Sequence, residues 1–162
     1  MDAAEIRKYT FKEKQMGEPI GPVQVRFRRE GENIQYFELG AKSLPEIKID
    51  WTTLSKEERD QEHFGARFLC AATLACFTNT IYNALNRDGA TVKYLEARAS
   101  IKKEKDQIFR TRYTKILLEV NIKLGEGDKE VFRNVCEELE MGSLVTYSLP
   151  EGIEVEHDIQ MV

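Results

Sequence analysis

The feature that most constrains the fold is a long apolar segment, rich in small residues, in the middle of the chain. Residues 68–77 are apolar nearly all the way around a helix, and three alanines within them leave room for another element to approach closely. Ser55 and Glu58, which precede this segment, have the spacing of a capping box that starts a helix. A single helix over residues 56–87 would be about 48 Å long, too long for a chain of 162 residues. The segment therefore predicts a buried central helix, with a break in the helical run near residues 63–65.

Strands are expected before the helix. Between residues 23 and 28 apolar and polar residues alternate, which is the pattern of a half-buried strand. The turn-forming residues 30–33 follow, and residues 34–39 are expected to form the returning strand of a hairpin. Shorter extended pieces are expected at residues 9–11 and 46–49.

Strands are expected again after the helix. Residues 91–103 and 108–124 flank the polar turn 104–107, which predicts a long antiparallel hairpin. A second helix should follow Asp128 and end at Met141, and residues 153–159 alternate as a final strand should. No linker divides this series, so we expect a single α+β domain.

The composition is that of an ordinary soluble protein, with 41% hydrophobic and 32% charged residues. The formal net charge of −4 argues against a nucleic-acid partner, because such binding needs clustered cations that displace counterions from phosphates. No apolar run approaches the ~20 residues that span a bilayer, and no segment resembles a signal peptide. We therefore expect a cytoplasmic protein whose partners include neither nucleic acid nor a membrane.

Three cysteines, Cys70, Cys76 and Cys136, direct attention to thiol chemistry. Their number is odd and they lack C-x-x-C or His-rich spacing, so the sequence suggests neither a disulfide framework nor a zinc site. His63 and His157 are isolated, and no metal or cofactor is expected. At least one thiol must be free within the chain, and the question is which one is reactive.

Two short motifs resemble the OsmC/Ohr family, the osmotically induced and organic hydroperoxide resistance proteins. Residues 67–77, Arg-Phe-Leu-Cys-Ala-Ala-Thr-Leu-Ala-Cys-Phe, resemble the family's helix motif, in which leucines and alanines precede a reactive cysteine, here Cys76. Residues 141–155 are similar to the family's closing motif, where a Cys-Pro pair opens a short segment before the last strand. The order of elements over residues 20–160 is also similar.

The resemblance implies an OsmC-like fold over residues 1–162, with antiparallel sheets packed around the buried central helix. It implies an intertwined homodimer whose thiol sites lie at the subunit interface. It also implies that Cys76 reduces hydroperoxides, preferring organic ones, through a sulfenic acid that an external thiol or Cys136 would reduce.

Two positions depart from the family pattern and keep a second hypothesis open. The family's second, resolving cysteine should stand at the start of the closing motif, where this chain has Met141. The carboxylate that pairs with an activating arginine in the hydroperoxide-resistance branch should lie ten residues before Cys76, where this chain has Ala66. The alternative is a noncatalytic protein of the same fold that binds an apolar ligand or a partner in the dimer pocket.

A thiolate nucleophile needs a group that lowers the pKa of the thiol, and the arginines are the first candidates. Arg67 is near in sequence, but nine residues at about 100° each place it opposite Cys76 on a continuous helix. Arg67 would qualify only through a bend in the helix or by reaching across a dimer interface. Arg28 and Arg26, on an early strand, are the alternatives.

Helical spacing places Leu69, Thr73 and Thr80 on the same face as Cys76. The two threonine hydroxyls either edge a site around the thiol or bond to backbone carbonyls one turn back. Both interpretations remain open at this point.

The other two cysteines are assigned from their positions. Cys70 lies about 120° around the helix from Cys76, which is poor geometry for a disulfide, so we expect it to pack. Cys136 lies on an apolar helical stripe, which predicts a core residue. It also lies five residues before Met141, which would suit a displaced resolving thiol.

Overall fold

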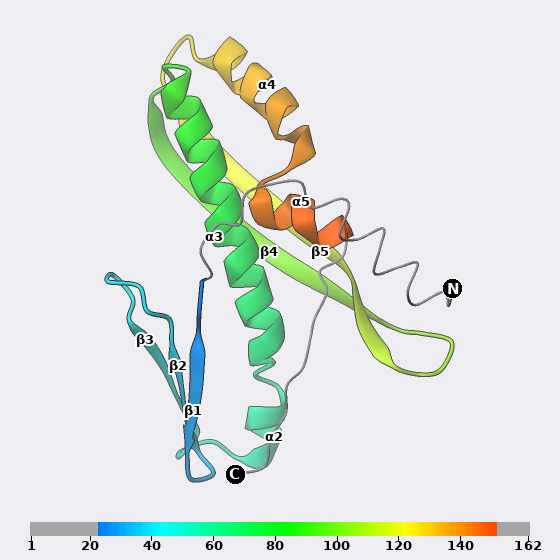
Figure 1. Ribbon diagram of the computed structural model, residues 1–162. Coiled ribbons are helices and arrows are strands. Elements are labelled where there is room, and N and C mark those ends of the chain that lie inside the picture. The colour runs from blue at the N-terminus through cyan, green and yellow to red at the C-terminus, as the bar shows by residue number, and fades with distance from the viewer. Residues whose placement is uncertain (1–22, 152–162) are drawn as a thin grey trace, which may run out of the picture. The chain divides into compact units, whose positions relative to one another are not determined.

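The computed structural model describes residues 23–151 (Figure 1). Contacts along the chain group into two compact units, residues 1–60 and residues 61–162. The strands predicted at residues 9–11 and 153–159 lie outside the described residues. The expectation of one domain over residues 1–162 stays a prediction.

The first unit contains a three-stranded antiparallel sheet. Its strands are β1 (Arg26–Glu30), β2 (Ile34–Glu38) and β3 (Glu46–Asp50), in that spatial order. The predicted strands and the hairpin turn between the first two are thus confirmed, with small shifts at their ends.

The two faces of this sheet differ in character. Phe27 pairs with Phe37, which pairs with Ile47, so these side chains share an apolar face on which the two rings lie 5.3 Å apart. Phe27 is nevertheless 58% exposed. On the other face the Arg28 guanidinium lies over the Tyr36 ring, 4.0 Å from its centroid. The apolar face of the first sheet is therefore incompletely covered in one chain.

The predicted capping box and the predicted helix break are both present. The Glu58 N–H donates to the Ser55 hydroxyl at 3.2 Å, and the Ser55 N–H donates to the Glu58 carboxylate at 2.7 Å, which starts α2 (Lys56–Asp60). His63 then adopts a left-handed conformation with φ of 48°, which interrupts the helical run. The long helix α3 (Phe64–Arg87) begins at the next residue.

The second unit is built on α3 and a long hairpin of β4 (Val92–Lys105) and β5 (Thr111–Leu124). Figure 1 shows α3 running along the hairpin, with α4 (Lys129–Glu138) beside the C-terminal end of α3 and α5 (Leu144–Glu151) beside its middle. A short 3-10 turn, η1 (Leu139–Met141), joins α4 to α5.

The hairpin turn lies two residues later than the sequence pattern suggests. The strand β4 continues to Lys105, and the turn covers residues 106–110 instead of 104–107. Asp106 explains the shift, because its carboxylate accepts the N–H of Ile108 at 3.0 Å and that of Arg110 at 2.8 Å. These bonds stabilise a wider loop, in which Phe109 has a φ of 62°.

The core of the second unit lies where the end of α3 meets α4 and the base of the hairpin. Leu85 and Val135 are completely buried, with Ile81, Ala84 and Ala90 around them. The prediction that Cys136 is a core residue is wrong. The side of α4 that carries Val135 faces the core, and the adjacent Cys136 is exposed.

The middle of α3 is only partly covered within one chain. Thr73 is buried, whereas Ala71, Ala72 and Ala75 are exposed, so burial of the central helix is not confirmed. The segment Lys56–Arg87 contains an 18-residue window of mean hydropathy 1.3, of which 22% is buried. By length and composition alone such a segment suits either a membrane span or a core helix that needs a cover.

Replacement of Leu85 by alanine should lower the free energy of unfolding by about 3 kcal/mol, because it leaves a cavity at the centre of the core. Leu144→Ala is the matched control, since the Leu144 side chain is 78% exposed and its loss should cost about 0.5 kcal/mol or less. Urea denaturation at one fixed protein concentration measures both changes. Equal effects of the two substitutions would contradict this location of the core.

Candidate thiol site

The described site is formed where the start of α5 meets the middle of α3. Cys76 lies on α3 and is half-buried. Gly142, with a φ of 81°, turns the chain from η1 into α5 and brings Ser143 to the helix start. Ser143 is only 2% exposed. Two segments far apart in sequence thus meet at the Cys76 thiol.

Neutral hydrogen-bond donors lower the pKa of Cys76. The Ser143 hydroxyl has the largest effect, followed by the backbone N–H groups of Val145 and Leu144, while partial burial opposes them. The N–H groups in the first turn of a helix have no partner within it, and the helix dipole favours an anion there. A thiol at this position is expected to ionise more readily than a free cysteine.

Thr80 has a different role from these donors. Its side chain also lies within reach of the thiol and lowers the pKa of Cys76, but less than the others. Its hydroxyl donates to the Cys76 carbonyl at 2.8 Å, so its single proton serves the backbone. Thr73 likewise donates to the Leu69 carbonyl at 2.7 Å. Backbone bonding, one of the two interpretations, is observed for both threonines, and Thr80 also lies beside the thiol.

A hydroxyl pair fixes the start of α5. The Ser143 N–H donates to Thr146 Oγ1 at 2.6 Å, and the two side-chain oxygens lie 3.0 Å apart. A Cβ atom on residue 142 would lie 2.5 Å from Thr146 Oγ1, so glycine leaves the space that this arrangement needs. The pair resembles a capping box in which threonine replaces the usual Glu or Gln.

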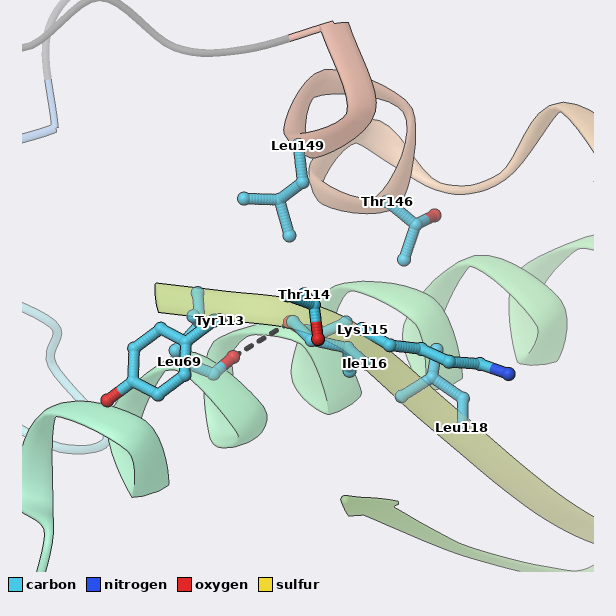
Figure 2. A pocket seen from close by; sticks show the side chains of 9 residues that line it. Leu69, Tyr113, Thr114, Lys115, Ile116, Leu118, Thr146 and Leu149 are labelled. Atoms are coloured by element: carbon cyan, nitrogen blue, oxygen red, sulfur yellow. Dashed lines mark hydrogen bonds between the residues drawn. The ribbon is translucent and has the colours of Figure 1, made fainter. Parts of the chain in front are cut away.

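An open pocket of about 420 Å³ lies among α3, β5 and α5. In Figure 2 Thr146 and Leu149 project from α5 toward the side chains of α3 and β5. Cys76 does not line this pocket, but Thr73, one turn earlier on α3, and Thr146 both do. The remaining lining residues are mostly apolar or aromatic with a few polar groups, namely Leu69, Tyr113, Thr114, Lys115, Ile116 and Leu118.

The arginines expected to activate Cys76 have local partners of their own. Arg67 is exposed, and its Nε donates to the Glu62 carbonyl at 2.5 Å, near the start of α3. Arg28 lies within 3.8 Å of the carboxylates of Glu38 and Glu46 in its own sheet. The groups that lower the pKa of Cys76 are hydroxyls and backbone amides, and an activating role for either arginine stays a prediction.

The other thiols differ from Cys76. Cys136 is exposed as a residue, yet partial burial of its thiol raises the pKa of that thiol. Cys70 is half-buried on α3, which fits a packing role. Among the described residues, no group of three or more His, Cys, Asp or Glu side chains comes together to hold a metal ion.

Ser143 is the functional residue that the sequence pattern did not single out. The resemblance directed attention to Met141, whereas the closing-segment side chain that acts on Cys76 is that of Ser143. Its local signal is Gly-Ser-x-x-Thr at residues 142–146, the spacing of a helix start. That signal indicates a cap but does not indicate that the cap faces a cysteine.

The α+β fold places a half-buried cysteine of one helix against the first turn of another, which defines a protein with a thiol site. Comparison with known proteins gives its family. The family model described as OsmC-like protein matches residues 66–158, more than half of the chain, so the chain belongs to the OsmC-like family. Cys76, Ser143 and the pocket residues all lie within the match.

A solved structure supports the same fold. An OsmC-like protein of unknown function from Vibrio cholerae superposes with a TM-score of 0.61 at 9% identity, over 78% of this chain and 92% of that chain. At this identity the likeness establishes the fold alone. No curated protein matches the sequence.

Cys76 should be alkylated at lower pH than Cys136, because hydrogen bonds lower the pKa of the first thiol and burial raises that of the second. Only the thiolate reacts with iodoacetamide. Each unit of difference between the two pKa values therefore changes the ratio of the two alkylation rates about tenfold at neutral pH. Peptide mass spectrometry across a pH series measures both midpoints. Coincident midpoints would contradict the proposed environment of Cys76.

Proposed function

We propose that this OsmC-like protein is a thiol-dependent peroxidase that reduces organic hydroperoxides through Cys76. The observation that carries the proposal is the set of donors around the thiol, namely the Ser143 hydroxyl and the N–H groups that begin α5. Thiol peroxidases need a thiolate, and these donors favour it without a cation.

The reaction transfers one oxygen atom to sulfur. The Cys76 thiolate attacks the terminal oxygen of R–O–OH, the O–O bond breaks, and the departing alkoxide takes a proton from solvent to become the alcohol. Sulfur is oxidised by two electrons to the sulfenic acid, and the hydroperoxide is reduced by the same two. A first external thiol then displaces water to give a mixed disulfide, and a second thiol releases the reduced Cys76.

An external thiol fits this cycle better than Cys136 does. Cys136 lies exposed on α4, and its raised pKa leaves it mostly protonated at neutral pH. Ser143, the closing-segment side chain that contacts Cys76, is a hydroxyl and cannot form a disulfide. We therefore propose a cycle with one essential cysteine, in which Cys136 is not required.

The pocket favours organic hydroperoxides over hydrogen peroxide. Its volume of about 420 Å³ and its mainly apolar lining suit a hydrocarbon body, which a small polar peroxide lacks. Thr146 lines the pocket and contacts Ser143 of the thiol site, so a substrate body in the pocket would place its peroxide group toward Cys76.

A noncatalytic binding protein is the second candidate, and one observation favours it. Cys76 does not line the pocket, so an apolar ligand could occupy the pocket without meeting the sulfur. The position of the family's carboxylate is Ala66, which is 8% exposed and has no acidic group to offer. This candidate predicts ligand binding without peroxide consumption.

We propose in addition that the protein is an intertwined homodimer in the cytoplasm. Its apolar surfaces need a cover, because Ala71, Ala72 and Ala75 on α3 and Phe27 on the first sheet are exposed in one chain. A second copy is the cover that the family resemblance implies. We also propose that no membrane takes part, since an α3 covered by a second copy has no need of lipid.

Reduced protein should consume cumene hydroperoxide in the presence of a thiol reductant, and Cys76→Ser should lower the rate by at least 100-fold to the background level. Cys70→Ser and Cys136→Ser are the matched controls, each expected to keep the rate within about twofold. Coupled consumption assays with the four proteins measure this. A rate that survives Cys76→Ser would reject the peroxidase, and no consumption by any of them would favour the binding protein.

Light scattering in solution should give a mass of about twice the 18.7 kDa of one chain. The exposed apolar surfaces provide the physical reason, because their burial drives association. A mass of one chain at protein concentrations of tens of micromolar would overturn the homodimer.

A further inference from the structure

Thr146 belongs to both the thiol site and the pocket. Its side chain lines the pocket, and its hydroxyl contacts Ser143, which in turn contacts Cys76. Thr146 is not among the groups that lower the pKa of Cys76. An effect of Thr146 on the thiol would therefore pass through Ser143.

The hydrogen bonds around this pair define a direction. The Ser143 N–H donates to Thr146 Oγ1 at 2.6 Å, which leaves the proton of the threonine hydroxyl to donate elsewhere. Ser143 Oγ lies 3.0 Å from it, closer than the Ser143 carbonyl at 3.3 Å. When Thr146 donates to Ser143 Oγ, the serine proton is free to point at the Cys76 sulfur. In that orientation the two hydroxyls would form a chain of donors from Thr146 through Ser143 to the thiolate.

The Thr146 side chain lies close against Gly142. The Cβ of any residue other than glycine at position 142 would lie 2.5 Å from Thr146 Oγ1 and 3.3 Å from the Tyr147 nitrogen. Ser143 is 2% exposed, so water has little access to take the place of the threonine hydroxyl. The Ser143 hydroxyl oxygen thus has two contacts with Thr146, with its Oγ1 at 3.0 Å and with its N–H, which donates at 3.4 Å.

We propose that Thr146 is a positioning residue, which orients the Ser143 hydroxyl so that it donates to the Cys76 thiolate. The proposal deepens the function proposed above and rests on it only for its catalytic consequence, because the effect on thiolate formation exists whether or not peroxide is reduced. Since Thr146 also lines the pocket, the residue that orients the donor is one that a bound substrate would touch.

The test is the pH profile of Cys76 alkylation by iodoacetamide in a Cys70→Ser, Cys136→Ser background. Thr146→Val keeps the shape of the side chain and removes its hydroxyl, so the rate below the midpoint should fall about 3- to 10-fold, as expected for one lost hydrogen bond. The rate at high pH, where the thiol is fully ionised, should not change. Thr146→Ser retains the hydroxyl and should restore the parent profile.

Two further variants separate positioning from a merely structural role. Ser143→Ala should lower the alkylation rate below the midpoint at least as much as Thr146→Val does. The double variant Ser143→Ala, Thr146→Val should lower that rate no further than Ser143→Ala alone, because the two hydroxyls act in series. Thr78→Val removes a hydroxyl that donates to the Leu74 carbonyl at 2.7 Å elsewhere on α3, and its profile should match the parent.

The proposal is overturned if folded Thr146→Val keeps the parent profile, if it slows alkylation equally at every pH, or if the losses in the double variant are additive. Circular dichroism establishes that each variant is folded. Should Thr146→Val not fold, comparison of Thr146→Ser with Thr146→Ala decides by the same profile. Because alkylation needs no peroxide, failure of the peroxidase and failure of the positioning role give different results.

Discussion

The contact between the first turn of α5 and the middle of α3 is the interaction on which the rest of the site depends. It brings Ser143 and the N–H groups of Leu144 and Val145 to the Cys76 sulfur. The contact itself depends on Gly142, whose positive φ begins α5, and on the space that glycine leaves for Thr146. The pocket among α3, β5 and α5 is a product of the same packing. The donors around the thiol and the pocket thus both follow from how two distant segments meet.

Much of the fold could be predicted from the sequence, because its signals are local. The Ser55 capping box, the helix break near His63 and the strands of both sheets follow from spacing and alternation. The hairpin turn was misplaced because the carboxylate of Asp106 stabilises a later loop. Cys136 was placed in the core because helical periodicity gives the apolar face of α4 but not how much of that face the neighbouring elements cover.

The site could be predicted only in part. The helix motif indicates Cys76, and helical geometry already placed Arg67 opposite Cys76; its Nε donates to the Glu62 carbonyl, near the start of α3. Ser143 could not be found in the same way, because its contact with Cys76 joins residues far apart in the chain and depends on tertiary packing. The search for an activating cation was natural, since charge is visible in a sequence. Backbone N–H groups at a helix start are not visible in a sequence, although they stabilise an anion by the same electrostatics.

As a peroxidase thiol, Cys76 should form a sulfenic acid when it meets an organic hydroperoxide. Dimedone, which reacts with sulfenic acids, tests it most directly when it is present while the reduced protein receives one equivalent of cumene hydroperoxide without any thiol reductant. We expect one dimedone adduct per chain, located by peptide mass spectrometry at Cys76 and absent from Cys70 and Cys136. An adduct at Cys136 instead, or no adduct with the hydroperoxide left unreacted, would contradict it.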